Sequence, residues 1–94
     1  MVWYHGTSVV RAKDIYKCGF FREGTFFARH LEDAVEFGGS YVFRVRVNFK
    51  STKWQVCSLN RISIDKIEQI YRVRKEKSGR DIHLIRVQKE GRTP

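Results

Sequence analysis

The sequence has little of what usually stiffens, cross-links or anchors a small chain. It has one proline and two cysteines, and Cys18 and Cys57 lie too far apart to form a Cys-x-x-Cys pair. We therefore expect neither a disulfide framework nor a zinc knuckle. No run approaches the roughly 18 apolar residues of a membrane span, and the first residues lack the charged and then apolar pattern of a signal peptide. We expect a soluble, cytoplasmic protein without membrane contact.

Several common catalytic motifs are also missing. The chain contains no GxGxxG, no GxxxxGK[ST] and no GxSxG, and its three histidines form no HxxxH or HExxH pair. These absences argue against Rossmann-type dinucleotide binding, P-loop nucleotide hydrolysis and serine-hydrolase chemistry. Because no cluster of His and Cys occurs either, no metal site is expected.

The chain is short and strongly basic. Its 94 residues include 19 Lys+Arg against 10 Asp+Glu, which leaves a formal charge of +9. A composition with 41% hydrophobic and 14% aromatic residues is typical of a folded protein, and this length supports one modest core. We expect a single domain over residues 1–88, followed by a frayed tail over residues 89–94.

The positive charge is concentrated in the second half, because residues 50–94 hold 12 basic and 5 acidic side chains. Such a field attracts polyanions such as nucleic acid or a phosphate-bearing cofactor, although a solvated, solubilising surface has the same composition. Aromatic residues that interleave with the charges, Trp54 among them, can hold single strands by stacking or can belong to the core. The candidate contacts to nucleic acid or phosphate are Arg44, Arg46, Arg72, Arg74 and Lys75.

Hydrophobic periodicity indicates two helices. Apolar residues recur every three or four positions over residues 9–18, after the capping candidates Thr7 and Ser8 and before Gly19. A second helix begins at Leu31 and is closed by the glycines at 38 and 39. Both helices are short, as expected for so small a domain.

Most of the remaining elements are predicted to be strands. Strict alternation of apolar and polar residues predicts a strand over residues 41–49, and β-branched or aromatic runs predict others. A capped helical turn is expected at 63–66, a hairpin turn at 77–80, and further strands at 2–5, 25–28, 54–57, beyond 68 and at 82–87. We expect a compact α+β fold whose twisted, mostly antiparallel β core is split into sheets, with two short helices.

Four segments in this order resemble the superfamily of poly- and mono-ADP-ribosyltransferases. The matching segments are Tyr4-His5-Gly6-Thr7, Cys18-Gly19-Phe20, residues 24–28 and the helix at 33–37. Members share an H-G-[ST] strand, a helix with a G-[FL] exit and a G-x-Y-F-A segment. The similarity extends over residues 2–73 and implies an ADP-ribosyltransferase-like fold in a minimal, degenerate member.

The resemblance implies an NAD site. His5 would hydrogen-bond a ribose hydroxyl, and Gly6, followed by Thr7, would let the nicotinamide amide approach the backbone because it has no side chain. Phe26 stands where the family usually has a tyrosine that stacks on nicotinamide, and Phe27 follows it in the motif. Each assignment has a competing interpretation: His5 is a strand-end histidine that hydrogen-bonds a neighbouring carbonyl, and one of the two phenylalanines belongs to the core.

The third family position is a glutamate on a later strand, and Gln55 stands there. With His5 it completes the implied catalytic pair. An amide cannot supply the negative charge that stabilises an oxocarbenium-like transition state, and losing one such electrostatic group typically costs ~10²–10³ in rate. The competing interpretation is that Gln55 is an ordinary exposed strand residue.

The function implied by the resemblance uses NAD as substrate, cleaving its nicotinamide–ribose bond and passing ADP-ribose to a protein or nucleic-acid acceptor. An alternative is a catalytically inactive basic module on the same fold that binds nucleic acid or protein. A third is a transferase that uses NAD on phosphorylated RNA, with His30 as its second histidine. A cognate protein, such as an immunity protein for a toxin, is a further candidate partner.

Overall fold

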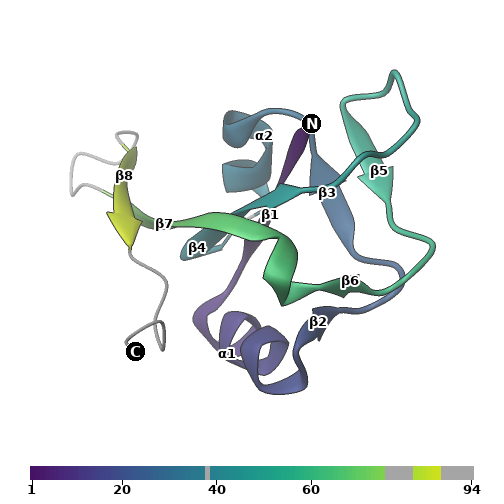
Figure 1. Ribbon diagram of the computed structural model, residues 1–94. Helices are drawn as coiled ribbons and strands as arrows, with labels where there is room; N and C mark the ends of the chain where they lie inside the picture. Colours follow the sequence, from purple (N-terminus) through teal and green to yellow (C-terminus); the bar gives the residue numbers. More distant parts are fainter. Residues whose placement is uncertain (38, 76–81, 88–94) are drawn as a thin grey trace.

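The computed structural model describes residues 1–37, 39–75 and 82–87, which form a layered α+β arrangement (Figure 1). In chain order the elements are β1 (Val2–Thr7), α1 (Val9–Cys18), β2 (Phe20–Phe21), β3 (Phe26–Ala28), α2 (Leu31–Glu36), β4 (Tyr41–Arg46), β5 (Gln55–Cys57), β6 (Ile62–Ser63), the 3₁₀ turn η1 (Ile64–Lys66), β7 (Ile67–Lys75) and β8 (Ile82–Val87).

The strands form two sheets. The larger has the order β5-β3-β1-β4-β7-β8, and every neighbouring pair in it is antiparallel. The smaller pairs β2 with β6, also antiparallel. The predicted α+β class, the mostly antiparallel core and the two helices are therefore confirmed.

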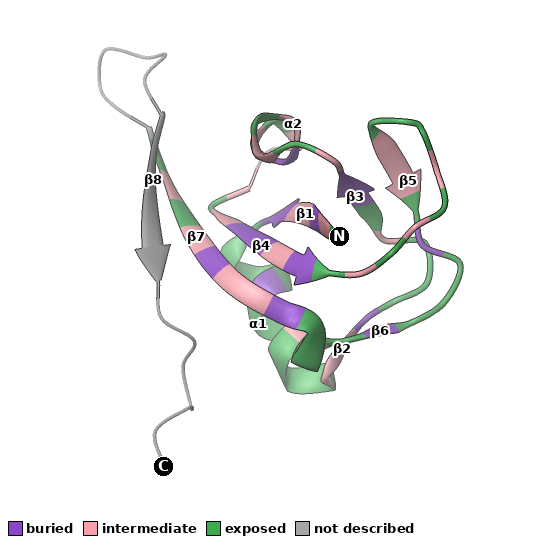
Figure 2. Ribbon diagram, turned by 45° about the horizontal axis from the view of Figure 1, so that its top comes forward, coloured by how far each residue is buried: buried purple, intermediate pink, exposed green. Residues whose placement is uncertain are grey.

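Two hydrophobic clusters flank the larger sheet, as expected when residues on a strand point alternately to its two faces. On one face Ala34 of α2 packs with Ala28 and Val42. On the other face a larger cluster contains Trp3, Ala12 of α1 and three phenylalanines, Phe21, Phe27 and Phe43. Figures 1 and 2 show α2 on one side of the sheet and α1 with the small sheet on the other, so the core has two layers.

Helix α1 begins and ends as the sequence predicts. The hydroxyl of Ser8 accepts a hydrogen bond from the backbone N–H of Arg11 at 3.2 Å, which caps the first turn. Gly19 ends the helix with a φ of 90°, and its N–H donates to the carbonyl of Ile15 at 2.8 Å. These caps fix where α1 starts after β1, and therefore which face of the helix lies toward the C-terminal end of β1.

Some predicted boundaries were wrong. The strand predicted over residues 41–49 ends at Arg46, because β7 provides no partner beyond Val45. One further hydrogen bond continues along the β1 side, from the N–H of Val47 to the carbonyl of Met1. The first strand extends past residue 5 to Thr7 because β4 pairs along its whole length. The hairpin turn expected at 77–80 and the tail at 89–94 lie outside the described residues.

Within the described part of the chain, neither helix is long and apolar enough to cross a membrane.

Candidate active-site cleft

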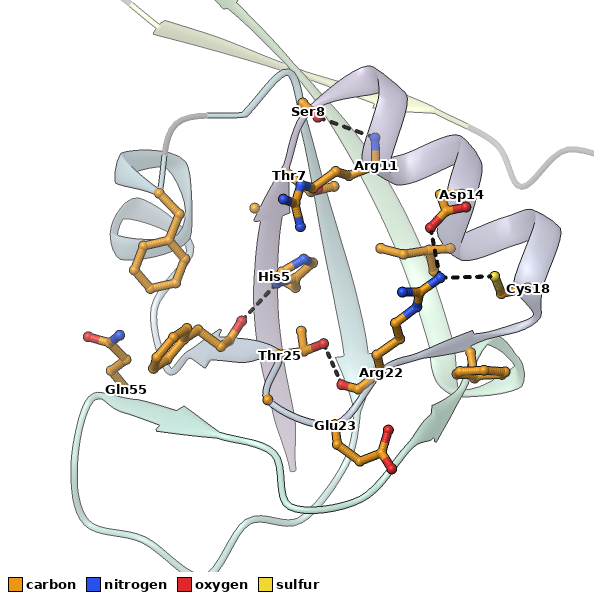
Figure 3. Close-up of a pocket in the computed structure, with 16 residues that line it drawn as sticks. His5, Thr7, Ser8, Arg11, Asp14, Cys18, Arg22, Glu23, Thr25 and Gln55 are labelled. Atoms are coloured by element: carbon orange, nitrogen blue, oxygen red, sulfur yellow. Dashed lines mark hydrogen bonds and ion pairs between the residues drawn. The ribbon is translucent and has the colours of Figure 1, made fainter.

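A cleft opens where β3 separates from β1. These strands share a single register pair, Tyr4 with Ala28, and then diverge. The gap is bounded by α1 on one side and by the segment between β2 and β3 on another, and it encloses about 620 Å³ (Figure 3). Because β1 and β3 separate here, side chains from both strands reach the same space.

The cleft brings together the residues to which the resemblance gives a role on three separate strands. His5, Gly6 and Thr7 line it from β1, Phe26 from β3, and Gln55 from β5. Strand pairing explains the convergence, since β5 pairs with β3 and places Gln55 opposite Ala28. In Figure 3 His5 lies between Gln55 on one side and Arg11 of α1 on the other.

His5 is held by one well-defined hydrogen bond. Its Nδ1 lies 2.7 Å from the backbone oxygen of Phe26, and a carbonyl can only accept, so Nδ1 carries the proton. Burial lowers the pKa of His5, the bond to Phe26 opposes this, and the charge of Arg11 lowers it further. The ring is therefore neutral near pH 7 and its Nε2 is left as an acceptor. A ligand hydroxyl can donate to that nitrogen.

Phe26 and Phe27 have different environments. Phe26 is 50% exposed and lines the cleft, so its ring face is available for stacking. Phe27 is fully buried; its ring packs edge-on against Phe21 at 5.4 Å and in a tilted arrangement against Phe49 at 5.3 Å. The structure therefore places Phe27 in the core, where it supports His5, rather than on the cleft surface.

Gly6 lines the cleft, but its missing side chain serves helix packing. A Cβ at this position would lie 2.0 Å from the backbone oxygen of Ala34 in α2. That oxygen cannot move without shifting the helix, so β1 requires glycine for α2 to pack closely. Packing against α2 is thus a structural reason for glycine here, beside the ligand approach that the resemblance implies, which stays a prediction.

The α1 side of the cleft carries charged residues that the motif comparison did not select. Arg11, Asp14 and Cys18 follow one another at helical spacing and line the cleft from one face of α1. Arg22, from the segment after β2, lies 3.5 Å from the carboxylate of Asp14 and 3.9 Å from the sulfur of Cys18. A helical projection of residues 9–18 next to the His-Gly-Thr motif would have indicated this charged wall.

The segment between β2 and β3 is anchored by backbone and hydroxyl contacts. The N–H of Gly24 donates to the carbonyl of Ser58 at 2.8 Å, and the N–H of Ser58 donates to the carbonyl of Thr25 at the same distance. The hydroxyl of Thr25 donates to the carbonyl of Arg22 at 2.6 Å. This wall of the cleft is thus tied to the chain that follows β5.

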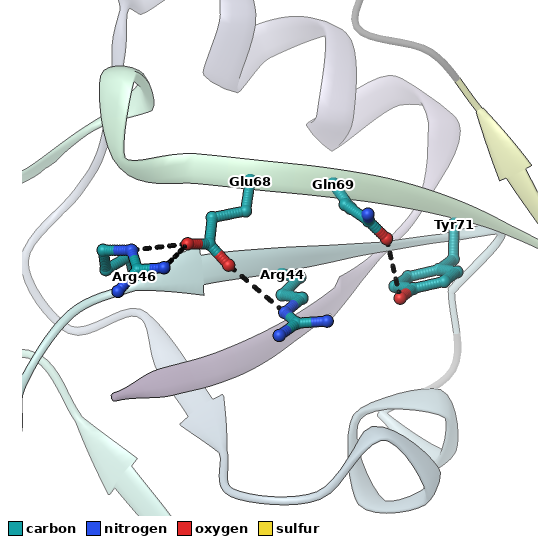
Figure 4. Close-up of polar contacts among 5 residues, drawn as sticks. All are labelled: Arg44, Arg46, Glu68, Gln69 and Tyr71. Carbon is teal, nitrogen blue, oxygen red and sulfur yellow. Dashed lines mark hydrogen bonds and ion pairs between the residues drawn. The ribbon is translucent and has the colours of Figure 1, made fainter.

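The four candidate basic contacts whose side chains the structure describes do not form one patch, and none of these four lines the cleft. Arg44 and Arg46 are ion-paired with Glu68 on the face of the sheet that α2 partly covers (Figure 4). Arg72 and Arg74 are exposed and alternate with residues of the other face of β7. The side chain of Lys75 lies outside the described residues.

The described residues contain no group of three or more His, Cys, Asp or Glu side chains arranged to hold a metal ion.

No protein-family model, curated protein or solved structure matches this chain.

Proposed function

We propose that the cleft binds NAD and that the chain is a minimal ADP-ribosyltransferase-like domain. The observation that supports this most is convergence: three motifs spread over some fifty residues of sequence contribute to one cleft. A volume of about 620 Å³ is also within the usual range of about 300–1,000 Å³ for small-molecule sites.

The residues of the cleft suit the parts of NAD that the resemblance assigns to them. The Nε2 of neutral His5 can accept a hydrogen bond from a ribose hydroxyl. The exposed ring of Phe26 offers a face for nicotinamide. Arg11 supplies a positive charge on the opposite wall, where a phosphate would be attracted.

The proposed reaction breaks the bond between nicotinamide nitrogen and ribose C1′, with the bonding electrons leaving on nicotinamide. A nucleophile of the acceptor then forms the new bond to C1′ and loses its proton. Gln55 can hydrogen-bond the ribose hydroxyls but carries no charge to stabilise the cationic sugar. We therefore expect weak transfer activity in the native chain.

The test is a titration with NAD followed by calorimetry and thermal unfolding. At ~100 times the dissociation constant, NAD should stabilise the fold by about 2.7 kcal/mol. His5→Ala should abolish this gain, whereas Leu59→Ala, an exposed residue outside the cleft, should retain it. Gln55→Glu should raise the rate of nicotinamide release by ~10²–10³. Absence of binding at millimolar NAD, in both the native chain and Gln55→Glu, would refute the proposal.

The competing prediction is the same fold without catalysis, as a basic nucleic-acid-binding or protein-interaction module. The version of it that relies on Arg44 and Arg46 is weakened by their ion pairs with Glu68, whose carboxylate competes with any incoming phosphate. The NAD titration separates the two functions directly.

A further inference from the structure

A second, shallower groove lies beside the cleft at the edge of the larger sheet. It encloses about 380 Å³ and is lined by Phe26 and by residues 52–57, which lead into and form β5. Phe26 and Gln55 line both the groove and the cleft, so the two spaces are adjacent. Whatever occupies the groove therefore lies next to the proposed NAD site.

Two large aromatic side chains are exposed in this groove. Trp54 is 53% exposed and Phe26 is 50% exposed, whereas the other tryptophan, Trp3, is fully buried in the core. Trp54 thus adds little to the core, although a domain of this size needs most of its aromatic residues for packing. Exposed rings on a concave surface are typical of a binding site.

The backbone around Trp54 is held in place. The carbonyl of Trp54 accepts a hydrogen bond from the N–H of Arg29 at 2.7 Å, and the N–H of Lys53 donates to the hydroxyl of Ser51 at 3.0 Å. The first bond attaches the segment to the chain after β3, and the second shapes the segment itself. The ring of Trp54 is therefore presented from an ordered backbone, which reduces the entropy that a ligand must overcome.

The chain segment that leads into the groove carries charge of one sign. Residues 37–64 contain five Lys or Arg side chains and no Asp or Glu. Lys50 and Lys53 are both exposed on the segment that carries Trp54. Arg44 and Arg46 of the same stretch share the single carboxylate of Glu68. Lys50 and Lys53 are the cations nearest to Trp54 in sequence, and within the described residues neither has an ion pair.

We propose that this groove binds single-stranded nucleic acid, with one base stacked on Trp54 and the adjoining phosphates attracted by Lys50 and Lys53. Exposed rings accept unpaired bases through their π faces, and lysines follow the backbone. A duplex hides its base faces, and an acidic peptide would use the lysines without needing the ring. The strand would lie beside the cleft as the acceptor, a role that rests on the proposed transferase function.

The first experiment measures binding in the absence of NAD. A short single-stranded oligonucleotide is titrated into the protein, and tryptophan fluorescence reports stacking on Trp54 because Trp3 is buried. Trp54→Ala, followed by fluorescence polarisation of a labelled oligonucleotide, should weaken binding by roughly 5- to 150-fold, the loss expected for one stacked base. Trp54→Phe should restore most of it, and Leu59→Ala should change nothing.

The second experiment uses salt. For a single strand, the plot of log association constant against log salt concentration has a negative slope whose magnitude decreases by about 0.7 for each phosphate contact removed. Lys53→Gln should therefore make the slope shallower by about 0.7. Lys66→Gln removes the same charge from η1, away from the groove, and should leave the slope unchanged. Equal losses of slope in both variants would show nonspecific attraction and contradict the site.

The inference is overturned if the oligonucleotide does not bind at low salt, if Trp54→Ala binds as tightly as the native chain, or if a duplex or polyglutamate binds equally well. Because NAD is absent, NAD binding without oligonucleotide binding refutes the groove alone. Oligonucleotide binding without NAD binding refutes the proposed transferase and leaves the groove as a binding site.

Discussion

The two faces of β1 have different surroundings, the cleft on the side of His5 and helix α2 on the side of Gly6. His5 turns toward the cleft, where it is neutral and has a free acceptor nitrogen, whereas the next position, Gly6, is backed by the carbonyl of Ala34 in α2. Both belong to one short motif. A motif match by itself therefore does not distinguish the residue that meets a ligand from the residue that allows the fold to close.

The same contrast recurs on β3. Phe26 and Phe27 are adjacent and chemically identical, yet one is half exposed and the other fully buried. Strand alternation explains why they must differ, but the sequence does not say which of the two faces inward. The contrast between cleft-facing and core-facing neighbours can be tested with matched substitutions.

The largest effect is expected from the matched pair on β3. Phe27→Ala should lower the free energy of unfolding by about 3–5 kcal/mol, because it leaves a cavity among Phe21, Phe49 and His5. Phe26→Ala should cost less than about 1 kcal/mol, because the ring is half exposed, and should weaken NAD binding instead. Urea unfolding and calorimetry give both quantities, and equal stability losses would contradict the contrast.

A smaller loss is expected on the α2 face. Gly6→Ala should destabilise the fold by about 1–3 kcal/mol, because the new methyl group meets the backbone of Ala34 and the helix must shift. Gly24→Ala provides the contrast of backbone strain without steric overlap, since Gly24 has a φ of 84° and an added Cβ would meet no atom within 4 Å. If Gly6→Ala unfolds like the native chain but loses NAD, the ligand rather than α2 requires the glycine.

The smallest effect is a pH dependence on the cleft face. Burial lowers the pKa of His5 in the folded state, so the unfolded chain binds its proton more readily below a pH of about 6.5. The free energy of unfolding should therefore rise with pH up to that value and then level off. His5→Asn should flatten this slope between pH 5 and 7. A slope that survives His5→Asn would mean that another group is responsible.

Local patterns predicted most of the fold. Helical spacing with the caps Ser8 and Gly19 predicted α1, and the alternation of apolar and polar residues predicted the strand β4. Both signals depend on neighbours in sequence. The end of β4 at Arg46 was missed because it depends on where β7 begins, which no local signal records. The candidate site was predicted less completely. His5, Gly6, Thr7, Phe26 and Gln55 were selected from motifs, whereas the charged wall of α1 and the anchoring of residues 22–25 by Ser58 were not.

The sequence by itself determined the α+β class, the caps of α1, the positive charge and the order of the motifs, because each follows from composition or from spacing along one element. Only the tertiary structure decided which residues share a space. The divergence of β3 from β1 opened the cleft, Glu68 formed ion pairs with Arg44 and Arg46, and α2 packed against Gly6. These outcomes depend on contacts between segments far apart in sequence, where packing and charge pairing select among side chains that look equivalent locally.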